Sequence, residues 1–335
     1  MKRIFVTAIA MVSLSLGFVS CGGDDELVGN WVKGSAFEGE ARSDAASFVI
    51  NDEAYVGCGY TGKKRMNDLW KFNLDGSWTQ CADMPGVIRS HATGFAAAGK
   101  GYMGLGFNED IEENFGYLKD FYEYNPQNNT WTKIADFAGT GRHSALGFGI
   151  GNKGFVGMGY DDKYLKDMYS YTPSTGAWEK VTSIPGSKRM GASVFVIEDI
   201  AYVCCGMDNG SYVDEFYAYD AAKDQWTEKR KIANVSDRDY DNDYNIPRAY
   251  AAAFVINGKG YITCGESGSL RTDTWEYNPA TDLWEERTGF EGSARAGAIG
   301  ITLGNRGFVT TGRSASLKFD DTFEFHPTED YDEYD

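Results

Sequence analysis

The chain has 335 residues, of which 15% are aromatic, with 41 glycines but only 7 prolines. Abundant aromatic residues and glycines are typical of short strands joined by tight turns, and this length suits one large all-β domain. The net charge of −17, from 32 Lys+Arg and 49 Asp+Glu, would repel phosphate backbones, so nucleic acid is excluded as an expected partner.

The first twenty residues have the pattern of a secretory signal. Two basic residues precede an apolar run to Val19 that is too short, and wrongly flanked, for a membrane span. The sequence "FVSC" resembles the cleavage box of bacterial lipoproteins, which implies that Cys21 becomes the acylated first residue. We therefore expect a lipoprotein signal peptide at 1–20 and an acidic linker at 21–30. "GGDDE" also resembles a surface-export signal, and a solvated linker explains it equally well.

The resulting expectation is an exported outer-membrane lipoprotein exposed on the cell surface. Several acyl chains on one residue would anchor it stably, whereas one chain binds marginally. The membrane is then contacted only through the lipid. Whether the protein faces the periplasm or the exterior stays open.

Six repeats fill the rest of the chain. Each begins with an Arg, has an Ala three residues later and ends on a Gly 17 residues after the Arg, as in "RSHATGFAAAGKGYMGLG". An acidic residue, an aromatic residue and, in five units, a Trp follow, which predicts four short strands per unit. The six leading residues are Arg42, Arg89, Arg142, Arg189, Arg248 and Arg295.

The opening "GNWVKGSAFEGEAR" supplies a piece that the last repeat lacks. The sixth unit has no final Trp, yet Trp31 precedes Arg42 by 11 residues, the same spacing as four later Trp-to-Arg pairs. The N-terminal strand therefore completes the last unit, and a closed ring explains this. We predict a six-bladed β-propeller over 31–327 with four-stranded blades, followed by a disordered acidic tail at 328–335.

The units resemble kelch repeats, for instance in "NDLWKFNLDGSW" followed by "MPG" and the next Arg. The resemblance covers nearly the whole chain after the linker and implies the kelch propeller fold. The chain departs from the family's double glycine, because the first glycine of each pair is replaced. The replacing residues are Cys58, Leu105, Met158, Cys205, Cys264 and Thr311.

One rim of the ring is predicted to bind the ligand. The Trp-to-Arg and Gly-to-acid connections leave the same face, and both insertions, at 107–120 and 229–248, lie among them. The six arginines at this rim suggest a site for a carboxylate or sulfate. The alternative is that each pairs with an acid of its own blade. Those acids are Asp68, Asp120, Asp167, Glu215, Asp273 and Asp321.

Further polar residues directly follow the arginines. We expect the mouth of the axial channel to be lined by Ser43, Asp44, Ser90, His91, His143, Ser144 and Tyr250. The two histidines belong to neighbouring blades but are offset by one residue, so we expect their side chains to diverge, and no metal site. In "SDRDYDNDYN", carboxylates are as dense as in a calcium loop, but the required Gly and Glu are missing. We therefore expect a solvated acidic loop; the alternative is that Tyr240 and Tyr244, between the acids, stack on a sugar.

The five cysteines after Cys21 are odd in number and form no CxxC motif, so we expect small buried residues. Some kelch propellers are copper oxidases of the galactose oxidase type, but the required two His, two Tyr and Cys are not recognisable. No cofactor is expected.

The leading prediction is a monomeric surface-anchored binding protein that recognises a glycan or a protein on the loop-bearing rim. The alternative, implied by resemblance to six-bladed kelch sialic acid mutarotases, is a sugar mutarotase or epimerase. Such an enzyme needs an acid/base pair and an Arg for the carboxylate. The rim has these residue types, but the family's catalytic Glu-Arg segment is not recognisable.

Overall fold

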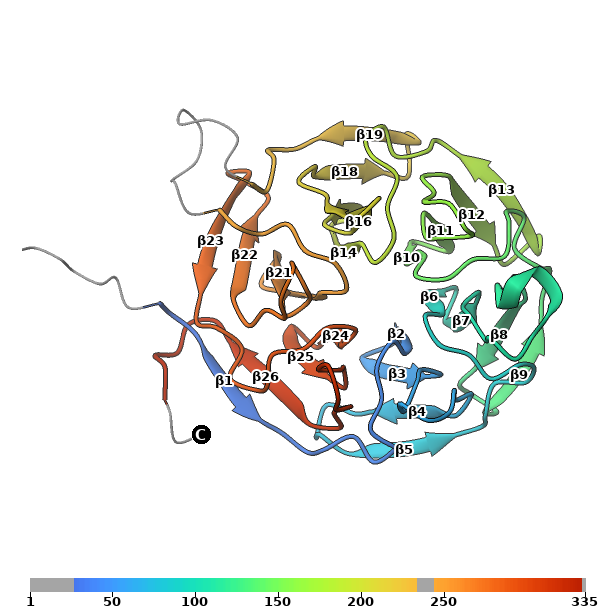
Figure 1. The fold of residues 1–335 in the computed structure, drawn as a ribbon, viewed down its shortest axis with the longest axis horizontal. Coiled ribbons are helices and arrows are strands. Elements are labelled where there is room, and N and C mark those ends of the chain that lie inside the picture. The colour runs from blue at the N-terminus through green and yellow to red at the C-terminus, as the bar shows by residue number, and fades with distance from the viewer. Residues whose placement is uncertain (1–26, 234–243, 333–335) are drawn as a thin grey trace, which may run out of the picture.

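The computed structural model describes residues 27–233 and 244–332. They form six four-stranded antiparallel sheets arranged as a ring around a central axis (Figure 1). The predicted all-β, six-bladed propeller is confirmed. In the described part of the chain, helical structure is confined to the 3-10 turn η1 (Glu113–Gly116), and no helix is long and apolar enough to cross a bilayer. Cys21, the expected lipidation site, lies outside the described residues.

In blades 1 to 5 the strands run outward from the axis in chain order. Blade 1 contains β2 (Ala46–Ile50), β3 (Glu53–Gly57), β4 (Leu69–Phe72) and β5 (Trp78–Cys81). Blade 2 contains β6 (Thr93–Ala97), β7 (Lys100–Gly104), β8 (Phe121–Asn125) and β9 (Thr130–Lys133). Blade 3 contains β10 (Leu146–Ile150), β11 (Lys153–Gly157), β12 (Met168–Thr172) and β13 (Ala177–Val181). Blade 4 contains β14 (Ser193–Ile197), β15 (Ile200–Cys204), β18 (Tyr217–Asp220) and β19 (Gln225–Glu228). Blade 5 contains β20 (Ala252–Ile256), β21 (Lys259–Thr263), β22 (Thr274–Asn278) and β23 (Leu283–Arg287). A small hairpin of β16 (Met207–Asp208) and β17 (Ser211–Tyr212) rises from blade 4.

The sixth blade combines the two ends of the chain. Its strands are β24 (Ile299–Leu303), β25 (Arg306–Thr310), β26 (Thr322–His326) and, outermost, β1 (Asn30–Lys33). Trp31 lies opposite Phe325 in the antiparallel pair and is fully buried. Its indole N–H donates to the Thr288 carbonyl at 3.3 Å. The closure that the Trp-to-Arg spacing predicts is therefore confirmed.

The acidic tail also contacts this closing strand. The Gly29 amide donates to the Glu329 carbonyl at 2.9 Å, and the Asp332 amide donates to Asn30 Oδ1 at 3.1 Å. The expectation of a disordered tail was wrong for residues 328–332, because their backbone hydrogen-bonds beside the start of β1. Residues 333–335 lie outside the described part.

Phenylalanines of the innermost strands pack between neighbouring blades. Phe48 stacks on Tyr55 of its own blade, with ring centroids 5.1 Å apart. It also covers Gly101 of the next blade, where a Cβ atom would lie 2.1 Å from the Phe48 ring. Phe95 and Gly154 repeat this arrangement one blade later. Because interiors are close-packed, a side chain at these glycines would separate the blades.

Four of the five cysteines in the described chain are buried as predicted, and Cys81 is half-buried. None of them forms a disulfide. Burial raises the pKa of the Cys58 and Cys264 thiols to about 12, which leaves both groups protonated. These residues act as small apolar side chains.

Candidate functional site

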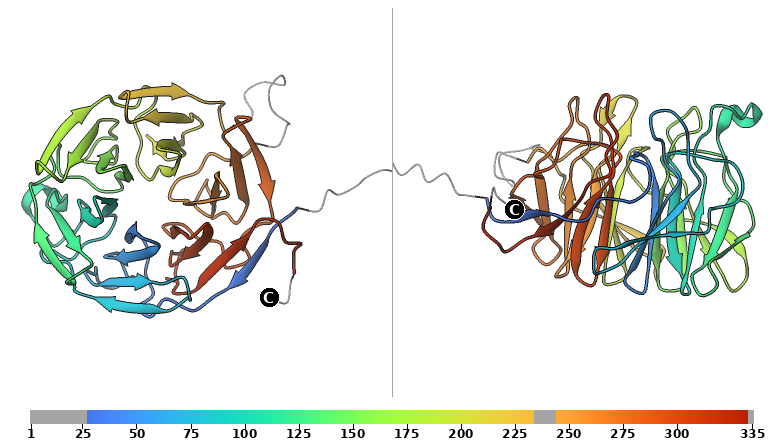
Figure 2. Two further views of the ribbon diagram at one scale, coloured as in Figure 1. Left: turned by 180° about the vertical axis from the view of Figure 1, so that it is seen from behind. Right: turned by 90° about the horizontal axis from the view of Figure 1, so that it is seen from below.

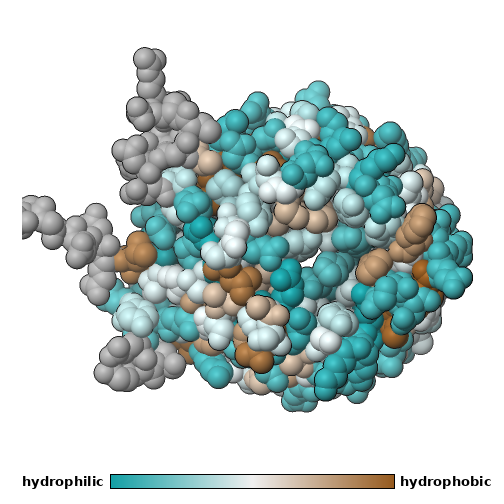
Figure 3. Space-filling view, in the orientation of Figure 1, coloured by the Kyte–Doolittle hydropathy of each residue, from teal (hydrophilic) through white to brown (hydrophobic). Residues whose placement is uncertain are grey.

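The insertion-bearing connections share one face of the ring. The blade 2 insertion with η1 and the described ends of the β19–β20 link rise on the same side of the disc (Figure 2). Figure 3 shows this face, which is mostly hydrophilic and hollowed at its centre. The expected common rim is therefore present in the described residues.

The six repeat arginines are structural. Each is at most 1% exposed, and its guanidinium group lies 2.5 to 2.6 Å from the acid of its own blade. The pairing interpretation is therefore confirmed. The anion-site interpretation was wrong, because the donor groups are turned into the blades. The residues concerned are Arg42, Arg89, Arg142, Arg189, Arg248 and Arg295.

Arg42 illustrates how each of these side chains ties three loops together. Its Nε donates to the Glu40 carbonyl at 2.9 Å, and Nη1 donates to the Cys58 carbonyl at 3.0 Å. Both Nη atoms contact Asp68, at 2.5 and 2.7 Å. Charge-assisted, bidentate pairs of this kind fix geometry. These bonds use four of the five N–H donors, and because the side chain is fully buried, an axial ligand cannot reach the guanidinium.

Just inside the arginines, six backbone amides form a closed circle around the axis. Each residue two positions after an Arg adopts φ between 52° and 63°, and its N–H donates to the equivalent carbonyl of the adjacent blade at 2.8 to 3.1 Å. This circle gives the side chains at the mouth a fixed position. Its members are Asp44, His91, Ser144, Gly191, Tyr250 and Gly297.

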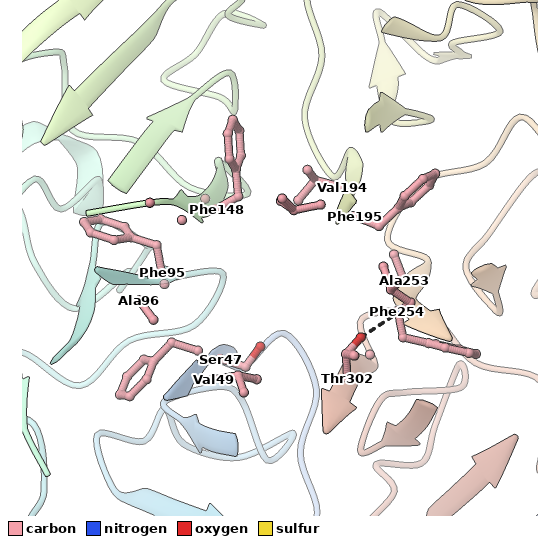
Figure 4. Close-up of a pocket in the computed structure, with 18 residues that line it drawn as sticks. Ser47, Val49, Phe95, Ala96, Phe148, Val194, Phe195, Ala253, Phe254 and Thr302 are labelled. Carbon is pink, nitrogen blue, oxygen red and sulfur yellow. Dashed lines mark hydrogen bonds between the residues drawn. The ribbon is translucent and has the colours of Figure 1, made fainter. Parts of the chain in front are cut away.

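Three cavities follow one another along the axis. The outermost, here called the mouth pocket, has a volume of about 430 Å³. Below the amide circle lies a chamber of about 120 Å³ lined by the repeat alanines. A third cavity of about 470 Å³ continues between the innermost strands. Figure 4 shows small side chains such as Ser47 and Ala96 around it, while Phe95 and Phe195 point away from the axis.

The mouth pocket is lined by charged, polar and aromatic residues from blades 1, 2, 3 and 6. These are Ser43, Asp44, Tyr60, Arg65, Ser90, His91, Phe107, His143, Arg313 and Lys318. The expected positions of Ser43, Asp44, Ser90, His91 and His143 are thus confirmed. Ser144 and Tyr250 line the chamber directly below.

Three cations face this pocket. The Arg65 guanidinium lies 5.0 Å from the Phe107 ring centroid and pairs with Glu109 of the blade 2 insertion. Arg313 lies 3.3 Å from Glu266 and 3.6 Å from Asp44. Cations over aromatic rings in a partly desolvated site are held in a defined direction.

Lys318 differs from the two arginines. Its Nζ lies 5.7 Å from the Tyr60 ring centroid, and among the described residues it forms no salt bridge with a carboxylate. Burial lowers the pKa of its ammonium group; the charge of Asp44 opposes this shift, and that of Arg313 adds to it. A positive charge that is partly desolvated and lacks an acidic partner favours an anionic ligand.

The two histidines converge, contrary to the expectation that they diverge. Their ring centroids are 5.4 Å apart. The left-handed backbone of His91, with φ 53°, turns its side chain toward His143 and so cancels the offset of one residue. Burial and then the charge of His91 lower the pKa of His143 to about 3. No group of three or more metal-ligating side chains occurs in the described residues.

Asp44 lies beside His91 in the amide circle. Its Oδ2 accepts a hydrogen bond from the Ser43 hydroxyl at 2.6 Å. Its Oδ1 is 3.3 Å from His91 Nε2 but, buried among the described residues, makes no hydrogen bond. A buried carboxylate oxygen without a donor favours a ligand group or water that can donate one.

Of the three tyrosines that the sequence suggested as ligand-binding residues, the two described ones do not lie together. The Tyr250 ring lies 6.1 Å from His91 and 5.7 Å from the Arg313 guanidinium, at the axis. The Tyr244 hydroxyl hydrogen-bonds the Trp284 backbone, and its ring packs against Trp275, so Tyr244 does not line the mouth pocket. Tyr240 lies outside the described residues, as do Asp237, Asp239, Asp241 and Asp243.

Sequence reasoning missed several lining residues of the mouth pocket. Tyr60, Phe107 and Arg313 each directly follow the closing Gly of a repeat, so this periodic position carried a signal. Arg65 and Lys318 each lie six residues after the closing Gly of a repeat and three residues before its acid, so this second periodic position carried a signal as well.

Comparison with known proteins gives the family. The model of the Attractin/LZTR1 beta-propeller matches residues 30–275. A solved structure titled "Structure of YjhT" superposes with a TM-score of 0.71 at 18% identity, over 86% of this chain and 96% of that chain. At this identity the likeness concerns the fold. No curated protein sequence matches. The chain therefore belongs to the Attractin/LZTR1 β-propeller family.

Proposed function

We propose that this protein is an exported, surface-anchored binding protein that recognises a carboxylate-bearing glycan in the mouth pocket. The observation that supports this most directly is Lys318, an ammonium group without an acidic partner among the described residues, facing the pocket beside Tyr60. Arg65 and Arg313 line the same pocket, where Glu109, Glu266 and Asp44 balance their charges. In a chain of net charge −17, a pocket-facing cation without a salt bridge to the described acids is therefore a specific feature.

The size and lining of the pocket favour a sugar over a protein. Its volume of about 430 Å³ is in the range of small-ligand sites, which combine apolar walls with a few oriented polar groups. Tyr60 and Phe107 supply aromatic faces, whereas Ser90, His91 and Asp44 supply hydrogen-bonding groups for hydroxyls.

Removal of the Lys318 charge tests the proposal. We expect wild-type protein to bind N-acetylneuraminic acid or D-galacturonic acid in calorimetry, more weakly at high salt. Lys318→Gln should weaken binding at least tenfold, and Lys318→Glu should abolish it. Lys63→Gln, which removes an exposed charge outside the pocket, is the matched control. The proposal fails if neither acid binds, or if both Lys318 variants bind like wild type.

One observation favours the mutarotase alternative. Asp44 Oδ1 and His91 Nε2 lie 3.3 Å apart in the mouth pocket, so that both groups are within reach of one sugar whose ring an acid/base pair would open. NMR of anomer exchange distinguishes the two functions. Exchange of N-acetylneuraminic acid that the protein accelerates and that His91→Gln slows supports the enzyme. Binding without acceleration supports the binding protein.

A further inference from the structure

A second hollow lies beside the mouth pocket, against the blade 2 insertion. This outer groove has a volume of about 400 Å³ and is lined by Phe115, Tyr117, Lys119, Thr140, Asp161 and Asp162, together with Asn114 and neighbouring glycines. It therefore joins blade 2 with two loops of blade 3. The proposed function does not use it.

The insertion presents an aromatic ring to solvent at this groove. Phe115 is 78% exposed, the largest fraction among the exposed large hydrophobic residues. Asn114 and Phe115 both have left-handed backbone, with φ of 51° and 55°. This conformation costs about 1–2 kcal/mol per residue for L-amino acids. Because left-handed non-glycine residues occur in every blade of this chain, it is the exposed ring beside a groove, rather than the backbone, that indicates a recognition role.

Two carboxylates face the same groove with acceptor capacity left over. Asp161 Oδ2 accepts from the Thr140 hydroxyl at 2.6 Å, and Asp162 Oδ1 accepts from the Tyr117 hydroxyl at 2.9 Å. The second oxygen of each has no side-chain hydrogen bond with the described residues. Acceptors beside an aromatic face suit sugar hydroxyls and C–H groups.

The outer groove and the mouth pocket share a wall. The Tyr117 ring lines the groove, and its centroid lies 5.6 Å from that of His143 and 5.8 Å from that of Phe107. His143 and Phe107 line the mouth pocket. A ligand that extends out of the pocket across this wall reaches Phe115 next.

We infer that the outer groove is a second subsite, so that the ligand is an oligosaccharide rather than a single sugar. This inference rests on the proposed function. An acidic unit occupies the mouth pocket, and the next units lie against Phe115. Those units are neutral, because the acids Asp161, Asp162, Glu112 and Glu113 outnumber Lys119 at the groove and would repel a second carboxylate.

The test compares one acidic sugar with its neutral extension. Calorimetry would measure the affinity of full-length protein for N-acetylneuraminic acid and for sialyllactose, in which a neutral disaccharide follows the acidic unit. We expect sialyllactose to bind at least tenfold more tightly. Phe115→Ala should remove that gain and leave the affinity for the monosaccharide unchanged, whereas Phe115→Tyr should retain it. Leu283→Ala, an exposed apolar residue on an outer strand, is the control.

The outcomes separate the two hypotheses. Equal affinity for both sugars, or a gain that persists in Phe115→Ala, overturns the second subsite while the proposed function stands. If neither sugar binds, the proposed function fails and the subsite fails with it. Because Phe115 is solvent-exposed, its replacement should not unfold the blade, and an unchanged thermal midpoint would verify this.

Discussion

At the residue scale, the missing first glycine of each kelch pair is explained by the arginine of the same blade. The residue in its place keeps the left-handed conformation, with φ of 57° to 63° in all six blades. Its carbonyl accepts a hydrogen bond from the repeat arginine at 2.9 to 3.3 Å. The buried guanidinium thus compensates for a conformation that glycine would adopt freely. Even the β-branched Thr311 is held in this way.

His143 should make the fold sensitive to mild acid. Its folded-state pKa of about 3 lies below the ordinary value of 6.5. Between these values the unfolded chain binds a proton that the folded protein excludes, so stability is complete above pH 6.5 and falls as the pH decreases. The groups around this ring are Phe107, Tyr117, Tyr160, His91 and, through its charge, Asp44.

Thermal unfolding of wild type and His143→Asn between pH 7 and pH 4.5 measures this effect. The wild-type midpoint should fall more steeply with acid than that of the variant. Paired carboxylates such as Asp120 and Asp273, whose pKa values are also lowered, contribute only below about pH 4. Parallel curves for the two proteins would contradict the prediction.

At the scale of the element, Trp31 is the largest buried side chain that β1 contributes to ring closure. Trp31 packs against Phe290 and Phe325, with ring centroids 5.0 and 4.8 Å away. Trp31→Ala should therefore destabilise the protein by about 3–5 kcal/mol, as is typical for a buried aromatic residue. Urea unfolding with a shared m-value measures the difference.

Trp178→Ala provides the matched control. Trp178 occupies the equivalent outer-strand position of blade 3 but is half-buried, and β13 is joined to its blade by a turn. A smaller loss is therefore expected. Equal losses in the two variants would show that closure does not depend on Trp31.

The elements were predictable because the repeats encode them, whereas the site was predictable only in part. Constant Arg-to-Gly spacing fixes which strands pair, so the blades and even the displaced strand at Trp31 follow from counting. The sequence placed His91 and His143 at the mouth but not their mutual orientation, since that depends on one left-handed residue. Phe115 lies in an insertion without periodicity, where tertiary contacts alone determine position, whereas Lys318 shares with Arg65 a repeat position whose signal was missed.

At the scale of the whole molecule, the closing blade shares its strands between the two ends of the chain. Backbone hydrogen bonds between β1 and β26 therefore oppose opening of the ring. Neighbouring blades otherwise meet through side-chain packing and a few hydrogen bonds, such as the amide circle at the mouth. A ring whose chain ends lie within one blade should thus be more stable than a ring whose ends lie between two blades.

Two circular permutants with the same linker between Asp332 and Leu27 test this idea. One has new ends in the turn 173–176, so that β12 and β13 come from opposite ends of the chain and pair as β26 and β1 do in the native protein. The other has new ends within 182–188, between complete blades. The first should unfold within a few degrees of wild type, and the second clearly earlier, because its end blades are joined only by packing and a few hydrogen bonds, such as that from the Gly191 amide to the Ser144 carbonyl. Equal thermal midpoints, with both permutants monomeric by light scattering, would show that contacts between blades hold the ring shut without a shared sheet.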